Sequence, residues 1–117
     1  MVWIHGGGNT TGMPSEYNPE IFVKSERIIF VSIAYRLGIF GWLSHPELRE
    51  QDGIDSSSNF ALLDQIMALK WVKENIQFFG GNPNNITIFG ESAGGQNVIA
   101  LYSCLLYTSP SPRDLLK

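Results

Sequence analysis

Blocks of apolar residues, separated by polar and glycine-rich stretches, predict three strands in this chain. Residues 1–4 are aliphatic, β-branched and aromatic, which is typical of a buried strand. Residues 27–35 form a nearly continuous apolar run, which favours a central parallel strand buried on both faces over a surface strand. A shorter apolar run at residues 86–89 predicts the third strand.

The clearest helical periodicity follows Asn59, which can cap a helix N-terminus together with the two serines before it. Apolar residues three or four positions apart predict a stripe that faces the core: Phe60, Leu63, Met67 and Trp71. Gly80 and Gly81 are expected to end this helix. Two further helices are expected, a short one at residues 19–25 and another at about residues 93–102.

The order of these elements predicts an α/β fold. Strand, loop, strand, helix, strand, turn and helix follow one another, and this alternation builds a parallel sheet with flanking helices. Residues 5–19 are rich in Gly, Pro, Thr, Asn and Ser and predict a loop. Residues 36–58 form a long irregular stretch, and a loop of that length inside a compact domain is usually functional or packs on itself.

Composition narrows the class of protein. The chain has 117 residues, 44% of them hydrophobic, which suffices for a packed core in one small domain. A net charge of −3 without a basic cluster argues against a nucleic-acid partner, and the apolar runs are too short and interrupted to span a membrane. A single cysteine, Cys104, excludes an internal disulfide framework.

The last residues do not follow the pattern of the rest. Residues 104–117 show no periodicity, carry two prolines and resemble a translated sequencing-library adapter read through in one frame. We therefore expect a partial α/β domain over residues 1–103 and a non-native tail over residues 104–117.

A serine stands in a turn motif between the third strand and the last helix. Gly90-Glu91-Ser92-Ala93-Gly94 matches the G-x-S-x-G pattern, in which a sharp turn lifts the serine hydroxyl above the sheet. A side chain in place of either glycine would strike the neighbouring strand or helix. The start of the following helix favours negative charge near the serine. Taken alone, five such common residues fit an ordinary glycine-rich turn equally well.

A glycine loop after the first strand gives the serine a chemical context. Val2-Trp3-Ile4-His5-Gly6-Gly7-Gly8 runs from an apolar strand into three glycines, which let the backbone approach a substrate closely. Attack on an ester carbonyl puts negative charge on its oxygen, and losing one preorganised N–H donor raises the barrier by about 3–4 kcal/mol. The loop could also cradle a phosphate, but no Lys-Ser/Thr follows it and G-x-G-x-x-G is absent, which argues against nucleotide binding.

Both motifs and two stretches between them resemble the type-B carboxylesterase/lipase family, which includes the cholinesterases. Residues 79–94 read Phe-Gly-Gly-Asn-Pro-Asn-Asn-Ile-Thr-Ile-Phe-Gly-Glu-Ser-Ala-Gly and fit the serine signature of that family. Tyr35-Arg-Leu-Gly-Ile-Phe-Gly41 and Leu62-Leu-Asp-Gln65 are further family landmarks. A neighbouring family similar to hormone-sensitive lipase usually has Asp before the serine, so Glu91 favours type B.

The resemblance implies a partial α/β-hydrolase fold, truncated at both ends in this chain. It implies Ser92 as the nucleophile, with Gly7, Gly8 and Ala93 as the donors of the oxyanion hole. The implied reaction is hydrolysis of a small-molecule carboxylic ester by acyl transfer, without a metal or a cofactor. Asn9 departs from the family, in which an aromatic residue that would face the active-site gorge usually follows the glycines.

The chain lacks groups that a serine nucleophile requires. In this fold the acid and then the histidine follow the serine, yet no histidine follows Ser92, and Asp114 in the tail is the one acid after it. We therefore expect an internal fragment of a longer esterase. His5 is expected to shape the glycine loop, and His45 to be an exposed loop residue. The competing interpretation is a non-catalytic cholinesterase-like adhesion domain, against which the intact serine and glycines argue.

The remaining candidates are expected to be mostly structural. Arg36 and Asp64 are expected to make buried polar links, whereas Glu91 either tunes the site or supports its structure. Phe40 and Trp42 lie in the long loop, where lining the gorge competes with a packing role. Three larger side chains are expected in the core: Met67, Trp71 and Phe78.

Overall fold

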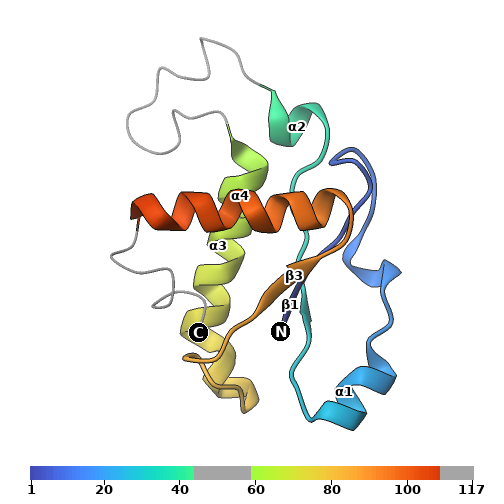
Figure 1. The fold of residues 1–117 in the computed structure, drawn as a ribbon, viewed down its shortest axis with the longest axis vertical. Coiled ribbons are helices and arrows are strands. Elements are labelled where there is room, and N and C mark those ends of the chain that lie inside the picture. Colours follow the sequence, from blue (N-terminus) through green and yellow to red (C-terminus); the bar gives the residue numbers. More distant parts are fainter. Residues whose placement is uncertain (44–58, 109–117) are drawn as a thin grey trace.

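Three parallel strands with helices packed against them confirm the predicted α/β arrangement (Figure 1). The computed structural model describes residues 1–43 and 59–108, with side chains up to residue 103. The strands are β1 (Val2–Ile4), β2 (Val31–Ser32) and β3 (Ile88–Gly90). The α-helices are α1 (Glu20–Glu26), α2 (Ile39–Trp42), α3 (Phe60–Asn75) and α4 (Ala93–Thr108), with 3-10 helices η1 (Pro14–Glu16) and η4 (Ile76–Phe79).

The central strand of the sheet is β1, and the prediction that residues 27–35 form it is wrong. The strand order is β2-β1-β3, and Val2 of β1 pairs with Val31 on one side and Ile88 on the other. The paired part of the apolar run is limited to β2, because Arg27 still caps the end of α1 in a left-handed conformation and β1 offers only three residues as partners. Ile33, just past the ladder, is instead buried in the core.

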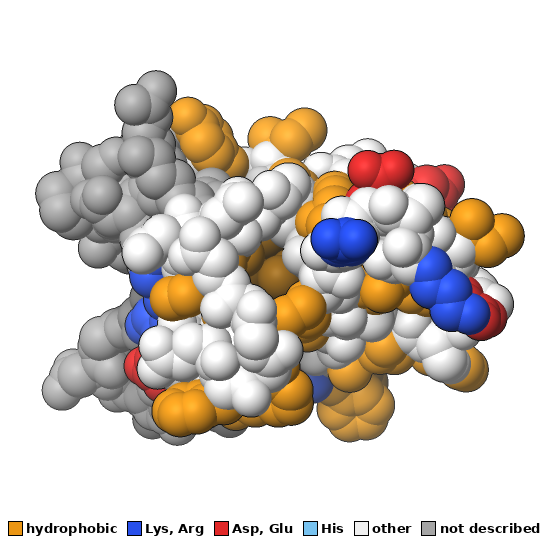
Figure 2. Space-filling view, turned by 90° about the horizontal axis from the view of Figure 1, so that it is seen from below, with side chains coloured by type: hydrophobic (Ala, Val, Ile, Leu, Met, Phe, Trp, Pro, Cys, Tyr) orange, Lys and Arg blue, Asp and Glu red, His pale blue; other side chains and the backbone are white. Residues whose placement is uncertain are grey.

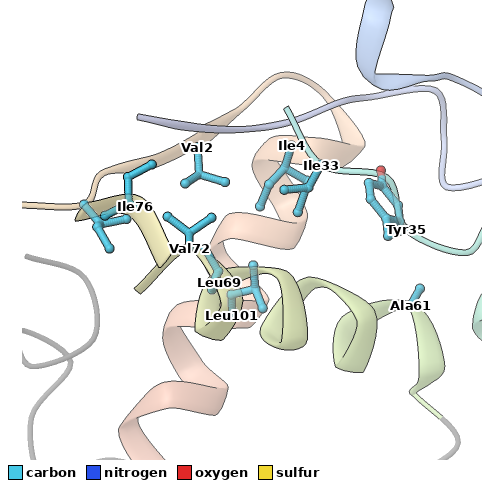
Figure 3. Close-up of a cluster of buried hydrophobic side chains, with 10 residues drawn as sticks. Val2, Ile4, Ile33, Tyr35, Ala61, Leu69, Val72, Ile76 and Leu101 are labelled. Carbon is cyan, nitrogen blue, oxygen red and sulfur yellow. The ribbon is translucent and has the colours of Figure 1, made fainter. Parts of the chain in front are cut away.

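The core lies between the sheet and the two long helices. Val2 and Ile4 point from β1 toward Leu69 and Val72 of α3, and Leu101 of α4 closes the cluster (Figure 3). Side chains alternate along a strand, so Trp3 lies on the opposite face of β1. There an aromatic group covers the sheet: Trp3, Tyr17, Phe30 and Phe89.

The face of α3 that packs on the sheet differs from the predicted one. Its buried residues are Ala61, Gln65, Leu69 and Val72. Met67 and Trp71 are 67% and 50% exposed, and Phe78 in η4 is 76% exposed, so their placement in the core was wrong. Close contact with α2 requires a small residue at the start of this face, because a methyl group on Gly41 of α2 would stand only 2.8 Å from the Ala61 Cβ.

The ends of the helices agree with the sequence to within a few residues, except at α4. Asn59 stands at the N-cap position of α3, although its side chain makes no capping hydrogen bond. The helix tightens into η4 and stops at Gly80, which has a φ of 84°, as expected for a terminating glycine. By contrast, α4 continues to Thr108, beyond the expected end near residue 102.

Large apolar side chains also lie open to solvent on several elements. Figure 2 shows apolar groups on the face seen from below, interspersed with charged ones. The strongly exposed ones are spread over the four α-helices and η4 and include Ile21, Phe40, Met67, Phe78 and Ile99. Among the described residues, no helix is both long enough and apolar enough to cross a membrane.

Candidate active site

Ser92 occupies the turn that joins β3 to α4. Gly90 is the last residue of β3 and Ala93 the first of α4, so the chain reverses within two residues. Ser92 is exposed and has a φ of 56°, a left-handed conformation that residues other than glycine rarely adopt. Such strain persists where the surrounding structure enforces it, and it is common at functional sites.

The two glycines of the motif make this turn sterically possible. A Cβ on Gly94 would overlap the carbonyl oxygen of Ile4 in β1. A Cβ on Gly90 would stand 2.7 Å from the same oxygen and 2.5 Å from the carbonyl carbon of Gly94. These contacts confirm that a side chain at either position would strike a neighbouring strand or helix. They also place the serine turn directly against the end of β1.

Hydrogen bonds within the glycine loop set the directions of its peptide N–H groups. Gly7 and Gly8 have φ values of 114° and 63°, which glycine adopts readily. The backbone N–H groups of Thr10 and Thr11 both donate to the Gly7 carbonyl, at 3.1 and 3.0 Å. A trans peptide places its C=O and N–H on opposite sides, so the Gly8 N–H points away from this turn.

His5 holds the start of the loop. Its side chain is buried, and its Nδ1 lies 2.8 Å from the Gly6 carbonyl oxygen. Because a carbonyl oxygen can only accept, Nδ1 carries the proton and donates it. This bond turns the Gly7 N–H to the side opposite the imidazole. The ring also stacks on Tyr35 at 4.6 Å, so the expectation that His5 shapes the loop is confirmed. His45 lies outside the described residues.

The two motifs meet at one edge of the sheet. Ile4 of β1 pairs with Gly90 of β3, so the residues that follow each strand emerge side by side (Figure 1). A Cβ built on Gly6 would stand 3.3 Å from the Ser92 Cβ and 2.7 Å from the Glu91 carbonyl oxygen, which shows how closely the loop approaches the serine.

Three N–H groups around this junction have no hydrogen-bond acceptor in the part of the chain that the structure describes. None of the described residues accepts a hydrogen bond from the N–H of Gly7, Gly8 or Ala93. For Ala93 this follows from its place as the first residue of α4, where N–H groups have no partner within the helix. Free donors and a helix N-terminus both favour an anionic oxygen beside Ser92.

A hollow of about 340 Å³ adjoins the glycine loop. It is lined by Trp3, His5, Gly6, Gly7, Glu16, Tyr17 and Glu91. Glu91 extends from the serine turn over Gly6, so its carboxylate borders the space beside Gly6. In the described ranges, no group of three or more His, Cys, Asp or Glu side chains is placed to hold a metal ion.

Arg36 and Asp64 form an ion pair that joins the end of the β2 region to α3. The Arg36 Nε and Nη2 donate to the two Asp64 oxygens at 2.8 and 2.9 Å, and the Arg36 backbone N–H adds a third bond at 3.0 Å. The predicted polar link exists, but it is not buried, because the Arg36 side chain is 50% exposed. Burial alone would raise the pKa of Asp64, yet the hydrogen bonds and charge of Arg36 outweigh it and lower that pKa.

The two aromatic residues of the long loop are placed differently from each other. Trp42 packs against the hydrophobic core, which favours its packing role. Phe40 is 74% exposed.

Sequence reasoning also missed one buried polar residue beside the site, Asn97 on α4. The available signal was its position among apolar residues, since a polar group buried on such a helix face needs a partner.

A strained serine between a parallel strand and a helix, beside a glycine loop on the neighbouring strand, defines an α/β-hydrolase fold. The sequence matches the carboxylesterase family over residues 1–117. It is 48% identical over 101 residues to carboxylesterase 1D of Rattus norvegicus, and 46% identical over 101 residues to cocaine esterase of Homo sapiens. Each of these matches covers 86% of this chain but 17% of the relative.

Solved structures agree with the sequence relatives. A thermophilic PNB esterase is 43% identical and superimposes with a TM-score of 0.79 over 97% of this chain and 22% of that one. A second PNB esterase structure is 42% identical, with a TM-score of 0.81. The chain therefore belongs to the carboxylesterase family, and it spans about a sixth of the length of the curated relatives quoted above.

Proposed function

We propose that the protein containing this chain is a serine carboxylic-ester hydrolase with Ser92 as its nucleophile. The Ser92 oxygen bonds to the ester carbonyl carbon while its proton passes to a general base. The carbonyl oxygen becomes an oxyanion, which the N–H groups of Gly7, Gly8 and Ala93 stabilise. The alcohol then leaves with a proton, and water hydrolyses the acyl-enzyme by the same route in reverse.

The observation that carries this proposal is the set of unpaired N–H groups beside a strained serine. Gly7, Gly8 and Ala93 come from two neighbouring strand ends, and each leaves a donor free. Preorganised donors of this kind stabilise a developing negative charge without further reorganisation. Gly7 and Gly8 are also exposed, so a substrate oxygen can reach their N–H groups from solvent.

We assign the general base and its carboxylate partner to parts of the protein outside this chain. No histidine follows Ser92 in the sequence, and His5 is already committed to the Gly6 carbonyl. The names of the relatives favour small-molecule carboxylic esters as substrates. The hollow beside Glu91 and the glycine loop is the proposed place for one arm of such an ester.

The test uses the full-length protein and its Ser92→Ala variant. We expect the parent to be labelled covalently by an organophosphonate and to hydrolyse a p-nitrophenyl ester with saturation, because the hydroxyl is the attacking group. The variant should lose both properties while its circular dichroism spectrum stays unchanged. Labelling that survives the substitution would move the nucleophile elsewhere. A well-folded parent that neither labels nor turns over would instead support a non-catalytic adhesion domain.

A further inference from the structure

A partly buried pair of amide side chains connects the glycine loop to the helix that follows Ser92. Asn97 of α4 is 3% exposed, and its Nδ2 donates to the Asn9 Oδ1 at 2.8 Å, across 88 positions of sequence. Tyr35 lies beside the same group: its hydroxyl donates to the His5 carbonyl at 2.6 Å, and burial raises its pKa while the Asn97 side chain opposes that rise. The group therefore touches both ends of the glycine loop.

Asn9 is held from two sides. Its side chain is bound to Asn97, and its carbonyl accepts a hydrogen bond of 2.6 Å from the Gly38 N–H at the start of α2. Its φ of 59° is left-handed, and asparagine tolerates that conformation better than most residues. The side chain of Asn9 is thus directed to α4. Asn9 directly follows Gly8, so fixing Asn9 restricts the φ and ψ of Gly8, and the bonds from Thr10 and Thr11 to the Gly7 carbonyl hold the peptide that carries the Gly8 N–H.

Asn97 holds the Asn9 side chain from the α4 side. It lies one turn into α4, the helix whose first residue is Ala93 and whose N-terminus follows Ser92. The Asn9–Asn97 bond is therefore a direct link between the two halves of the proposed oxyanion hole. Donors must lie within about 2.7–3.1 Å of the oxyanion, and a shift of about 1 Å in a reacting group can reduce a rate about 10²-fold.

We propose that Asn97, acting through Asn9, is a positioning residue that sets the Gly8 N–H against Ser92 and Ala93. This inference rests on the proposed function, since it names the residues that position the donors of the proposed oxyanion hole. Neither asparagine touches the reacting atoms in this mechanism. Their effect should appear in the stabilisation of the oxyanion and not in the binding of the ground-state ester.

The experiment compares four forms of the full-length protein with the parent: Asn97→Ala, Asn9→Gly, the double variant and a control. Glycine at position 9 removes the amide without adding backbone strain, because it accepts the left-handed φ. The control is Asn75→Ala at the end of α3, which removes an amide that donates to the Trp71 carbonyl of its own helix. Active sites are counted by organophosphonate titration, so that kcat refers to folded enzyme.

We expect each single variant to lower kcat for a p-nitrophenyl ester about 10- to 100-fold while KM changes less than about threefold. The affinity for a trifluoromethyl ketone, which forms an oxyanion on the serine, should fall in parallel with kcat. The double variant should be no slower than Asn97→Ala alone, because both substitutions break the same link. The control should match the parent.

Three results would overturn the inference. The first is that both single variants keep kcat and ketone affinity within twofold of the parent. The second is a slow Asn97→Ala beside an unimpaired Asn9→Gly, which would route any effect through Tyr35 instead. The third is a fall in total activity that equals the fall in titratable sites while kcat per site is unchanged, which would make the pair a stabilising contact only. A parent that shows no Ser92-dependent labelling would refute the proposed function first, and this inference with it.

Discussion

Gly94 lies so close to β1 that a single methyl group would separate the serine turn from the sheet. In Gly94→Ala the new Cβ would meet the carbonyl oxygens of Ile4 and His5, and neither backbone atom can move without disturbing the strand. We expect the variant to lose about 1–3 kcal/mol of unfolding free energy, as overpacked sites do. Urea denaturation of the full-length protein measures this loss.

The next residue offers a matched control. A Cβ on Gly95 would come no nearer than 3.3 Å, to the Gly90 carbonyl oxygen. Alanine also favours a helix over glycine by about 1 kcal/mol. Gly95→Ala should therefore change stability little or raise it. If Gly94→Ala were as stable as Gly95→Ala, the close approach of α4 to β1 would be wrong.

At the residue scale, local motifs predict some positions and not others. Ser92 and the glycines could be proposed from sequence because a tight turn restricts residue types within five neighbouring positions. Asn97 could not, since its role depends on Asn9, which is distant in the chain and near only after β1 and β3 pair. The same holds for the unpaired N–H groups, because their directions depend on hydrogen bonds that the loop makes elsewhere.

At the scale of the elements, the Arg36–Asp64 pair should stabilise the packing of α3 against the segment that follows β2. We expect Asp64→Asn to cost about 1 kcal/mol at pH 7, since the pair has bidentate geometry but is partly exposed. The folded pKa of Asp64 lies below its ordinary value of 3.8, so the contribution is fully present above that pH and is lost as the pH falls through the folded value.

Urea denaturation at a series of pH values tests whether the contribution of the ion pair decreases as the pH falls. The difference between parent and Asp64→Asn should be constant from pH 7 to about pH 5 and should shrink as the pH falls further. Glu20→Gln is the matched control, because Glu20 pairs with Lys24 on the same helix and both side chains are largely exposed. It should have little effect at any pH. A difference for Asp64→Asn that grows on acidification would contradict the assignment.

The choice of helix face shows where prediction from periodicity stops. The sequence of α3 carries apolar residues around most of its circumference, so a three- or four-residue spacing fits more than one stripe. The largest side chains suggested one face, but close contact with α2 selects the face of Ala61. Gln65 is fully buried on that face, although neither its Nε2 nor its Oε1 has a hydrogen-bond partner among the described residues. Only the neighbouring elements reveal that position 61 needs a small residue.

At the scale of the whole molecule, the 117-residue chain expressed alone should be poorly soluble. Apolar side chains are exposed on α2, α3 and α4, and among the described residues β2 and β3 each leave one strand edge unpaired. The chain also has no histidine after Ser92. We therefore expect aggregation on size-exclusion chromatography and no saturable hydrolysis of a p-nitrophenyl ester.

The chain and its own Ser92→Ala variant provide the comparison. Loss of a triad member leaves only residual acceleration of about 10³–10⁴ over water in serine proteases, so the two should be nearly indistinguishable in an ordinary assay. A monomeric, cooperatively folded chain with Ser92-dependent turnover at ordinary esterase rates would contradict this expectation.

The fold class was predictable because strands and helices alternate, whereas the strand order was not, because it depends on long-range pairing.

The placement of β1 between β2 and β3 has a consequence for biosynthesis. Asn9 leaves the ribosome 88 residues before Asn97, its partner on the other side of the site. At about 5–20 residues per second, the strand and its glycine loop wait on the order of ten seconds before β3 and α4 exist. During that interval β1 can pair with β2, but its other edge is open. The proposed site can be assembled only at the end of this wait.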